Sequence, residues 1–239
     1  MVSIRAQVLP SQTGPDGLQT TVSVLTMMQD CSRLWFDSEP ELKGYLTANG
    51  LGIFIASRQT DIVRFGRYAE ELKVETGVYE CNGAFGYRNT FIYGAGGEPI
   101  AKSWSIGVFV DMATGRPARL PDRIVKAGTY DQKADMEYLD RKIVLPESEP
   151  EEYPCFTAMR SDIDLYDHVN NAQYIRMACE FLPEGRKYHR VRVEYKSPAK
   201  LHDRLFPFVR RAGDAVYVEL RNGAGGQFFV AEFSEPKCL

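Results

Sequence analysis

The segment from Ser161 to Asn171 concentrates the side chains of this chain that can do acid–base or nucleophilic chemistry. It reads S-D-I-D-L-Y-D-H-V-N-N and holds three carboxylates, one of the chain's three histidines and two asparagines. Asp164 and His168 lie four residues apart, close enough for their side chains to converge in a turn. A carboxylate in such a place can act as a general base toward water or as a direct nucleophile.

The element that would position these residues begins directly after them. Apolar residues recur at helical spacing over residues 171–182, which predicts a helix. The first-turn N–H groups of a helix lack intrahelical acceptors and carry partial positive charge, so they can polarise a carbonyl group. A reactive loop at a helix start is therefore one interpretation of this segment.

Two other interpretations stay open on these residues alone. Asp and Asn are common helix caps and turn formers, so the segment could be purely structural. The aspartates could also form a weak cation site, although the run lacks the glycine and the final glutamate of an EF-hand loop. No His, Cys and Asp cluster with ligand spacing occurs elsewhere, and no metal is expected.

The segment resembles the signature of the hotdog-fold thioesterases, in particular that of the acyl-acyl-carrier-protein (acyl-ACP) thioesterases of plants and bacteria. Their second repeat carries a pattern close to S-D-[IL]-D-x-N-x-H-V-N-N-x-x-Y. Residues 56–65 resemble the long central strand of the family's first repeat, and residues 103–121 resemble its Trp-containing and T-x-R-P segment. The residues that match the signature are Ser161, Asp162, Ile163, Asp164, His168, Val169, Asn170, Asn171 and Tyr174.

The resemblance implies roles for the loop residues. Asp164 would be the base or nucleophile, and His168 would orient the attacking group or assist proton transfer. Asn170 and Asn171 would hold the loop or bind the thioester. Tyr166 stands where the family usually has Asn; its hydroxyl could replace the amide as a donor in the catalytic site, or the ring could face the core.

A second carboxylate is harder to assign. Plant members carry a Glu-Cys pair at positions that align with Pro198 and Ala199, so neither role can be transferred. Glu194, on a predicted strand, is the nearest candidate for a further substrate-binding carboxylate, although a strand position of this kind is more often solvated. The family needs no cofactor, and none is expected.

The chain contains a diverged internal repeat, with a helix before a group of strands in each half. Helices are predicted over residues 21–35 and 171–182. The strand-like run at Asp61 has a counterpart at Glu194, and at nearly the same spacing the run G-A-G-G recurs at 94–97 and 223–226, between strand-like segments. Together with the resemblance, this indicates an α+β tandem (double) hotdog, in which each repeat is a long helix wrapped by a curved antiparallel β-sheet.

We expect three parts along the chain. Residues 1–145 would form the first repeat, which shapes the acyl pocket and has no equivalent of the D-x-x-x-H-V-N-N loop. Residues 146–154 would be an acidic linker broken by three prolines. Residues 155–239 would form the second repeat with a single catalytic loop, and the charged residues 131–139 would hold a short helix.

Composition indicates an ordinary soluble globular protein. The 239 residues are 44% hydrophobic and 26% charged, with no apolar run long enough to span a bilayer and no signal-peptide core. The five cysteines, at 31, 81, 155, 179 and 238, form no C-x-x-C pair, so neither disulfides nor zinc is expected and the cytoplasm is the predicted compartment.

Charge distribution bears on the partners. The net charge of −3 argues against general nucleic-acid binding. Residues 181–211 nevertheless contain nine basic and three acidic residues. This stretch is either a solvated sheet face or a docking surface for an acidic partner such as acyl carrier protein.

The leading functional prediction is the hydrolysis of acyl-ACP to a free fatty acid. An acyl-coenzyme A thioesterase and a non-catalytic acyl-thioester-binding protein are the alternatives. No membrane association is expected. A homodimer is conceivable, since the edges of a double hotdog sheet can pair with a second copy.

Overall fold

The computed structural model describes residues 1–236, so Cys238 lies outside the described residues. The chain divides into two compact units, Met1–Tyr138 and the residues from Leu139 onward. The other four cysteines are free thiols. No helix in the described part of the chain combines the length and the apolar character needed to cross a membrane.

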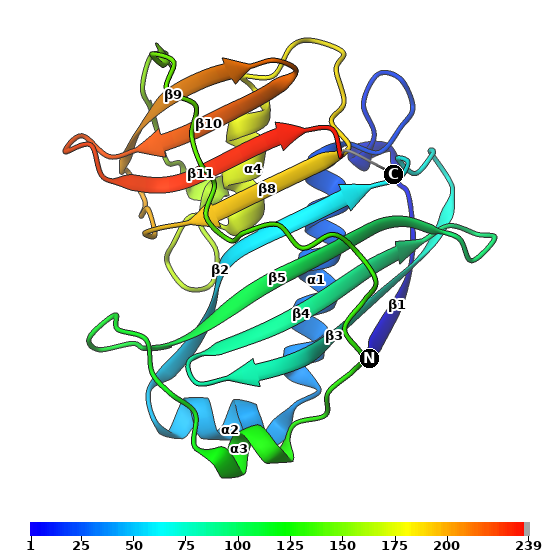
Figure 1. Ribbon diagram of the computed structural model, residues 1–239, viewed down its shortest axis with the longest axis vertical. Coiled ribbons are helices and arrows are strands. Elements are labelled where there is room, and N and C mark those ends of the chain that lie inside the picture. Colours follow the sequence, from blue (N-terminus) through cyan, green and yellow to red (C-terminus); the bar gives the residue numbers. More distant parts are fainter. Residues whose placement is uncertain (237–239) are drawn as a thin grey trace. The chain divides into compact units, whose positions relative to one another are not determined.

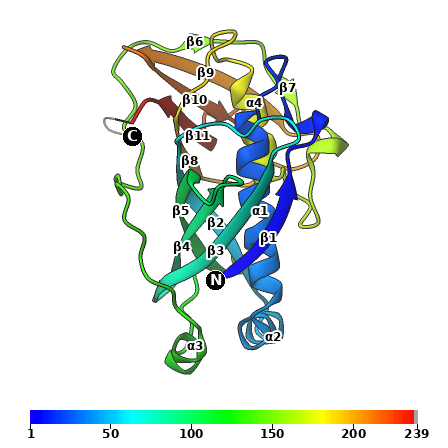
Figure 2. The same cartoon turned by 90° about the vertical axis from the view of Figure 1, so that its right-hand side faces the viewer.

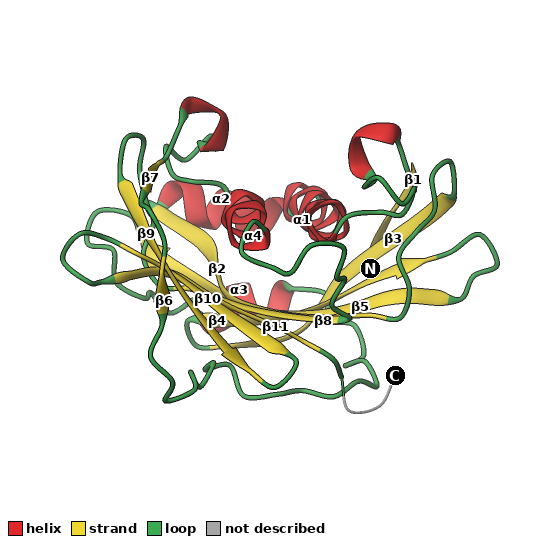
Figure 3. Cartoon of the chain, turned by 90° about the horizontal axis from the view of Figure 1, so that it is seen from above, coloured by secondary structure: helices red, strands yellow, loops and turns green. Residues whose placement is uncertain are grey.

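The first unit is a five-stranded antiparallel sheet with a long helix, α1 (Thr21–Asp37), across one face (Figures 1 and 3). The sheet order is β1-β3-β4-β5-β2. Two short helices, α2 (Pro40–Ala48) and α3 (Asp122–Ala127), lie at one end of the unit (Figure 2). The strands are β1 (Val2–Gln7), β2 (Leu51–Ile62), β3 (Glu71–Asn82), β4 (Phe85–Tyr93) and β5 (Pro99–Asp111).

Helix α1 forms where the sequence predicts it. The Thr20 side chain caps its start by accepting a hydrogen bond from the Ser23 N–H (3.1 Å). Val24, Met28 and Cys31 are buried on its sheet-facing side, in one core with strand residues. Leu34, which the spacing also places on this face, is instead 48% exposed.

The second unit repeats this plan with a shorter helix, α4 (Asn171–Cys179). The sheet order is β8-β11-β10-β9-β6, with β7 also paired to β9. The Tyr174 ring of α4 stacks on Phe229, with ring centres 5.3 Å apart. The strands are β6 (Glu151–Glu152), β7 (Phe156–Thr157), β8 (Arg190–Tyr195), β9 (Arg204–Ala212), β10 (Ala215–Arg221) and β11 (Gln227–Ser234).

The G-A-G-G runs form hairpin turns, as predicted, but the sequence match is out of register by a single position. The Gly97 N–H donates to the Gly94 carbonyl (2.9 Å), and the Gly225 N–H donates to the Asn222 carbonyl (3.0 Å). Gly97 and Gly225 have φ angles of 82° and 84°, which favour glycine. Asn222, and not Gly223, is therefore the structural counterpart of Gly94.

A second pair of turns confirms that the region of Asp61 corresponds to that of Glu194. The Arg67 N–H donates to the Glu70 carboxylate (2.9 Å), as the Lys200 N–H does to the Asp203 carboxylate (2.8 Å). The third residue of each turn is left-handed: φ is 65° at Ala69 and 71° at His202. The repeat therefore extends to individual hydrogen bonds.

An irregular segment covers the outer face of the first unit's sheet, opposite α1, where Figure 1 shows it in green. The Gln59 amide donates to the Glu137 carbonyl (2.8 Å), and the Asn89 amide oxygen accepts from the Ala134 N–H (3.1 Å). Gly77 leaves room for it, because a β-carbon there would lie 1.8 Å from the Asp131 carboxylate. The predicted helix at 131–139 is wrong, because sheet side chains bind this backbone; the helix is α3, further upstream.

The same kind of covering continues within the second unit. Arg192 donates to the carbonyls of Asp140 (2.5 Å) and Lys142 (3.3 Å), and Arg210 donates to that of Ser148 (2.9 Å). The acidic, proline-rich residues 146–154 contain only the two-residue strand β6, which pairs with β9. Polar side chains of each sheet thus form hydrogen bonds with backbone groups of a segment that has almost no regular secondary structure.

The basic stretch 181–211 is largely used within its own unit. Five of its nine cations form ion pairs with carboxylates: Arg186 with Asp214, Arg192 with Glu232, Lys196 with Glu194, Arg210 with Glu219 and Arg211 with Glu151. Arg190 is buried, with 4% of its surface exposed. These contacts favour the interpretation as a charged sheet face over that as an open docking surface.

Candidate active site

The predicted reactive segment is a compact loop between β7 and α4, and Asp162 holds it together. The Met159 N–H and Arg176 of α4 donate to the two oxygens of the Asp162 carboxylate (2.8 and 2.9 Å). Asp162 is only 4% exposed. Its carboxylate is therefore committed to the fold of the loop and to the attachment of that loop to the helix.

Within the loop, a tight turn places Asp164 opposite His168. The Asp164 N–H donates to the His168 carbonyl (2.9 Å), and the Asp167 N–H donates to the Asp164 carbonyl (3.1 Å). Asp167 makes the turn possible with a left-handed φ of 59°, which Asp tolerates better than most residues. Asp164 and His168 are both half-buried.

The side chains of Asp164 and His168 keep free hydrogen-bonding capacity. One Asp164 oxygen accepts from the Tyr166 N–H (2.9 Å). Within residues 1–236, the other Asp164 oxygen and the His168 imidazole form no hydrogen bond. A carboxylate oxygen and an imidazole without protein partners can bind a substrate or a water molecule.

Tyr166 does not face the core, because its side chain lies at the loop tip with 40% of the residue exposed. The neighbouring Leu165 is 74% exposed. The interpretation in which the Tyr166 ring faces the core is therefore wrong.

Asn170 and Asn171, at the start of α4, have different roles. The Asn170 amide oxygen accepts from the Ala172 N–H (2.9 Å), so Asn170 is the helix cap. The Gln173 N–H donates to the Asn170 carbonyl (2.9 Å). The Asn171 N–H has no acceptor in the described part of the chain, which leaves a first-turn donor available for an oxyanion.

Ala199, which aligns with the cysteine of the plant members, lies directly against this loop. The Val169 N–H donates to the Ala199 carbonyl (2.9 Å), and the Ala199 N–H donates to the Tyr174 hydroxyl (2.7 Å). Burial raises the pKa of Tyr174 to about 12, so its hydroxyl stays protonated.

Glu194 lies on the outer face of its sheet. The neighbouring Tyr195 faces α4, because its hydroxyl donates to the Asn171 carbonyl (3.2 Å), and successive strand residues alternate between faces. The Glu194 carboxylate is 4% exposed and accepts from the Ile143 N–H (2.7 Å) and from Lys196 (2.5 Å). These contacts give Glu194 a structural role, and no contact in the described part of the second unit joins it to the loop.

The first unit contains a loop with the same backbone path, contrary to the expectation that it has no equivalent. The Gly14 N–H donates to the Leu18 carbonyl (2.9 Å), and the Gly17 N–H donates to the Gly14 carbonyl (3.0 Å). The φ of Gly17 is 71°. The corresponding pairs, all with the same separation along the chain, are Gly14 and Asp164, Gly17 and Asp167, and Leu18 and His168.

The residues that fold the two loops correspond as well. The Gln12 side-chain oxygen accepts from the Leu9 N–H (2.9 Å), as Asp162 does from Met159. The Thr20 N–H donates to the Gln12 carbonyl (2.9 Å), as the Asn170 N–H does to the Asp162 carbonyl (2.8 Å). What the first loop lacks is a carboxylate and an imidazole, since Gly14 and Leu18 stand where Asp164 and His168 stand in the second loop.

Models of one protein family match both parts of the chain. The acyl-ACP thioesterase N-terminal domain matches residues 13–127, and the acyl-ACP thioesterase C-terminal domain matches residues 147–212. The chain belongs to the acyl-ACP thioesterase family. It is therefore a thioester hydrolase, and the family's reaction releases a free fatty acid from acyl-ACP.

Solved structures show the same fold over nearly the whole chain. An acyl-ACP thioesterase from Bacteroides thetaiotaomicron is 18% identical, with a TM-score of 0.86 over 97% of this chain and 96% of that one. The 12:0-ACP thioesterase from Umbellularia californica is 16% identical, with a TM-score of 0.85 over 97% and 96%. No curated protein sequence matches the chain significantly.

Proposed function

We propose that Asp164 performs the chemistry of acyl-ACP hydrolysis as general base or nucleophile, with His168 beside it. The observation that carries this proposal is the comparison of the two loops. They share their backbone path and the hydrogen bonds made by Gln12 and Asp162, yet only the second has a carboxylate and an imidazole with unused hydrogen-bonding capacity. The first loop folds without either group, which supports a chemical role for both.

The reaction follows from these groups. The Asn171 N–H at the start of α4 polarises the thioester carbonyl. In one route, Asp164 removes a proton from an attacking water, the C–S bond breaks, and the carrier's thiolate leaves without strong acid assistance as the fatty acid forms. In the other route, Asp164 attacks the carbonyl carbon itself and the C–S bond breaks as the acyl group is transferred to the carboxylate as an anhydride. Water then hydrolyses this anhydride, which releases the fatty acid and regenerates Asp164.

His168 and Tyr166 support the attack. The His168 imidazole orients the water or assists its proton transfer. The Tyr166 hydroxyl is the donor at the position where the family usually has an Asn amide. Asn170 acts indirectly, by capping the helix whose first N–H group is used.

The wider proposal is a double hotdog, consistent with a helix on an antiparallel sheet in each unit. In this arrangement, residues 1–145 shape the acyl pocket with side chains of α1, residues 146–154 connect the repeats, and residues 155–239 carry the catalytic loop. A cytoplasmic location, a part in fatty acid biosynthesis and a homodimer remain predictions, of which light scattering tests the last.

The deciding experiment is the hydrolysis of acyl-ACP thioesters over a series of chain lengths, with the matching acyl-coenzyme A esters in parallel. We expect turnover on the carrier-protein series, with an optimum that reports the pocket depth. A preference for coenzyme A esters would identify the acyl-coenzyme A alternative. Tight binding without turnover on either series would contradict the proposed chemistry and indicate an acyl-binding protein.

A further inference from the structure

Four exposed cations follow one another at one end of the first unit. Arg116 and Arg119 precede α3, and Arg123 and Lys126 lie on it. None of the four has a carboxylate within ion-pair distance among residues 1–236. Asp122 is the single acidic residue between the first and the last of them.

Several other basic side chains of the same unit are neutralised. Arg64 pairs with both Glu70 and Glu98, and Lys43 pairs with Asp37. An unpaired surface guanidinium keeps its full field and its hydrogen-bond donors for a partner. The α3 end therefore has positive charge that no ion pair neutralises. In the basic stretch 181–211, by contrast, most of the cations form ion pairs within their own unit.

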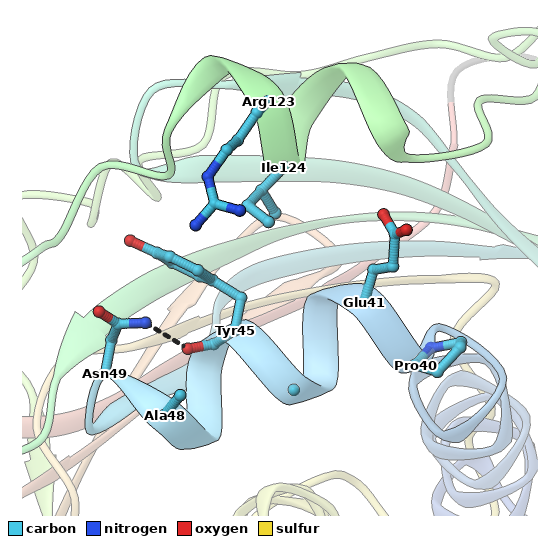
Figure 4. Close-up of a pocket in the computed structure, with 8 residues that line it drawn as sticks. Pro40, Glu41, Tyr45, Ala48, Asn49, Arg123 and Ile124 are labelled. Carbon is cyan, nitrogen blue, oxygen red and sulfur yellow. Dashed lines mark hydrogen bonds between the residues drawn. The ribbon is translucent and has the colours of Figure 1, made fainter.

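A groove of about 570 Å³ lies between α2 and α3, beside these cations (Figure 4). The Arg123 guanidinium stands over the Tyr45 ring on its wall, 5.7 Å from the ring centre. Glu41 of α2 also lines the groove, so its own charge is mixed. The two helices are fixed beneath it by a small core that includes Leu46 and Leu120.

We propose that Arg116, Arg119, Arg123 and Lys126, with the adjoining groove, form the docking surface for the acidic face of acyl carrier protein. The proposal rests on the proposed function, which makes this carrier the substrate's protein part. The carboxylates of an acidic partner suit arginines that lack ion pairs, because guanidinium and carboxylate bind in a two-pronged geometry. Complementary fields of this kind raise the encounter rate.

The test compares two double charge reversals in the complete protein. Arg119→Glu with Arg123→Glu alters the proposed surface. Arg5→Glu with Arg67→Glu makes the same charge change at two exposed cations that also lack ion pairs within the described residues. Each variant is assayed on acyl-ACP and on the same acyl group as a small N-acetylcysteamine thioester, which has no carrier protein.

We expect the first variant to lose about tenfold or more in kcat/KM on acyl-ACP, chiefly through KM, with the small thioester hydrolysed as before. The control variant should resemble the unaltered protein on both substrates. Unchanged kinetics on acyl-ACP would overturn the docking surface, and so would an equal loss on both substrates.

Binding of fluorescently labelled carrier protein, measured by anisotropy, separates this inference from the proposed reaction. If the unaltered protein hydrolyses neither substrate, the proposed function fails. The docking surface then stands only if the first variant binds the carrier more weakly than the control does. A variant that changes only the oligomeric state, with carrier binding intact, would show that a second copy of the chain occupies this surface and would overturn the proposal.

Discussion

At the scale of single residues, Asp162 and Asp164 lie two positions apart, and their carboxylates have different hydrogen-bond partners. Asp162 is buried and binds a backbone N–H group and Arg176, so it belongs to the fold. Asp164 keeps one oxygen free, and its counterpart in the first unit is Gly14. The motif in the sequence contains both residues but cannot distinguish them, because it does not record hydrogen-bond partners.

Replacement of Asp164 by Asn should remove the reaction and spare the fold. We expect kcat on acyl-ACP to fall by about a hundredfold or more, since an amide is neither base nor nucleophile. The thermal midpoint should stay close to that of the unaltered protein, because the amide oxygen can still accept from the Tyr166 N–H. Full turnover by a folded variant would exclude Asp164 from catalysis.

Replacement of Asp162 by Ala should have the opposite profile. The Met159 N–H would lose its acceptor and Arg176 its partner, at a cost of about 1–3 kcal/mol in the free energy of unfolding. Urea denaturation measures this loss, with the Asp164→Asn variant as the matched control in the same loop. Equal stability of the two variants would show that the Asp162 contacts contribute little.

Other residue predictions depended on neighbours in the folded structure, which the local sequence pattern does not show. At Tyr166, exposure at the loop tip ruled out the core-facing alternative, and the role as a donor stays a prediction. Glu194 was a candidate for substrate binding because of its type and strand position. Its partner Ile143 lies far earlier in the chain, in a segment with no regular structure.

At the scale of elements, helices α1 and α4 and the hairpin turns were predictable, whereas α2, α3 and the covering segments were not. Helix α1 has both a capping residue and an apolar stripe, and the hairpin turns have glycines, which are local signals. Residues 131–148 are charged and irregular, and their conformation comes from long-range bonds to Asn89, Arg192 and Arg210. A charge pattern therefore predicted a helix where the sheet instead imposes an extended path.

Replacement of Glu194 by Gln tests whether this residue supports the covering segment or the substrate. We expect lower stability and faster proteolysis near residues 140–148, because the Lys196 ion pair is lost and the Ile143 N–H keeps only a neutral acceptor. The KM for acyl-ACP should not change. A raised KM with normal protease resistance would instead restore the substrate-binding role.

At the scale of the whole molecule, the two repeats share individual hydrogen bonds, although their sequences have diverged. The separation between counterparts is widest at the two loops, smaller at the second pair of turns and smallest at the hairpins. The first unit thus has extra residues in between, among them α2. No single offset along the sequence aligns the two repeats, so the G-A-G-G match is out of register. The first loop was not recognised in the sequence because it has Gly14 and Leu18 in place of the Asp and His of the motif.

We predict one active site per chain, because the first loop lacks the carboxylate and the imidazole of the second. A non-hydrolysable acyl-ACP analogue, with an amide in place of the thioester, should titrate at one equivalent per chain in calorimetry. Two equivalents would show that Gly14 and Leu18 do not prevent the first loop from binding an acyl group.

The two loops also show that one backbone path accommodates different side chains. Gly14 and Leu18 occupy the positions of Asp164 and His168, and the turn keeps its two backbone hydrogen bonds. The side chains at these two positions can therefore differ between the repeats without a change in the path of the turn.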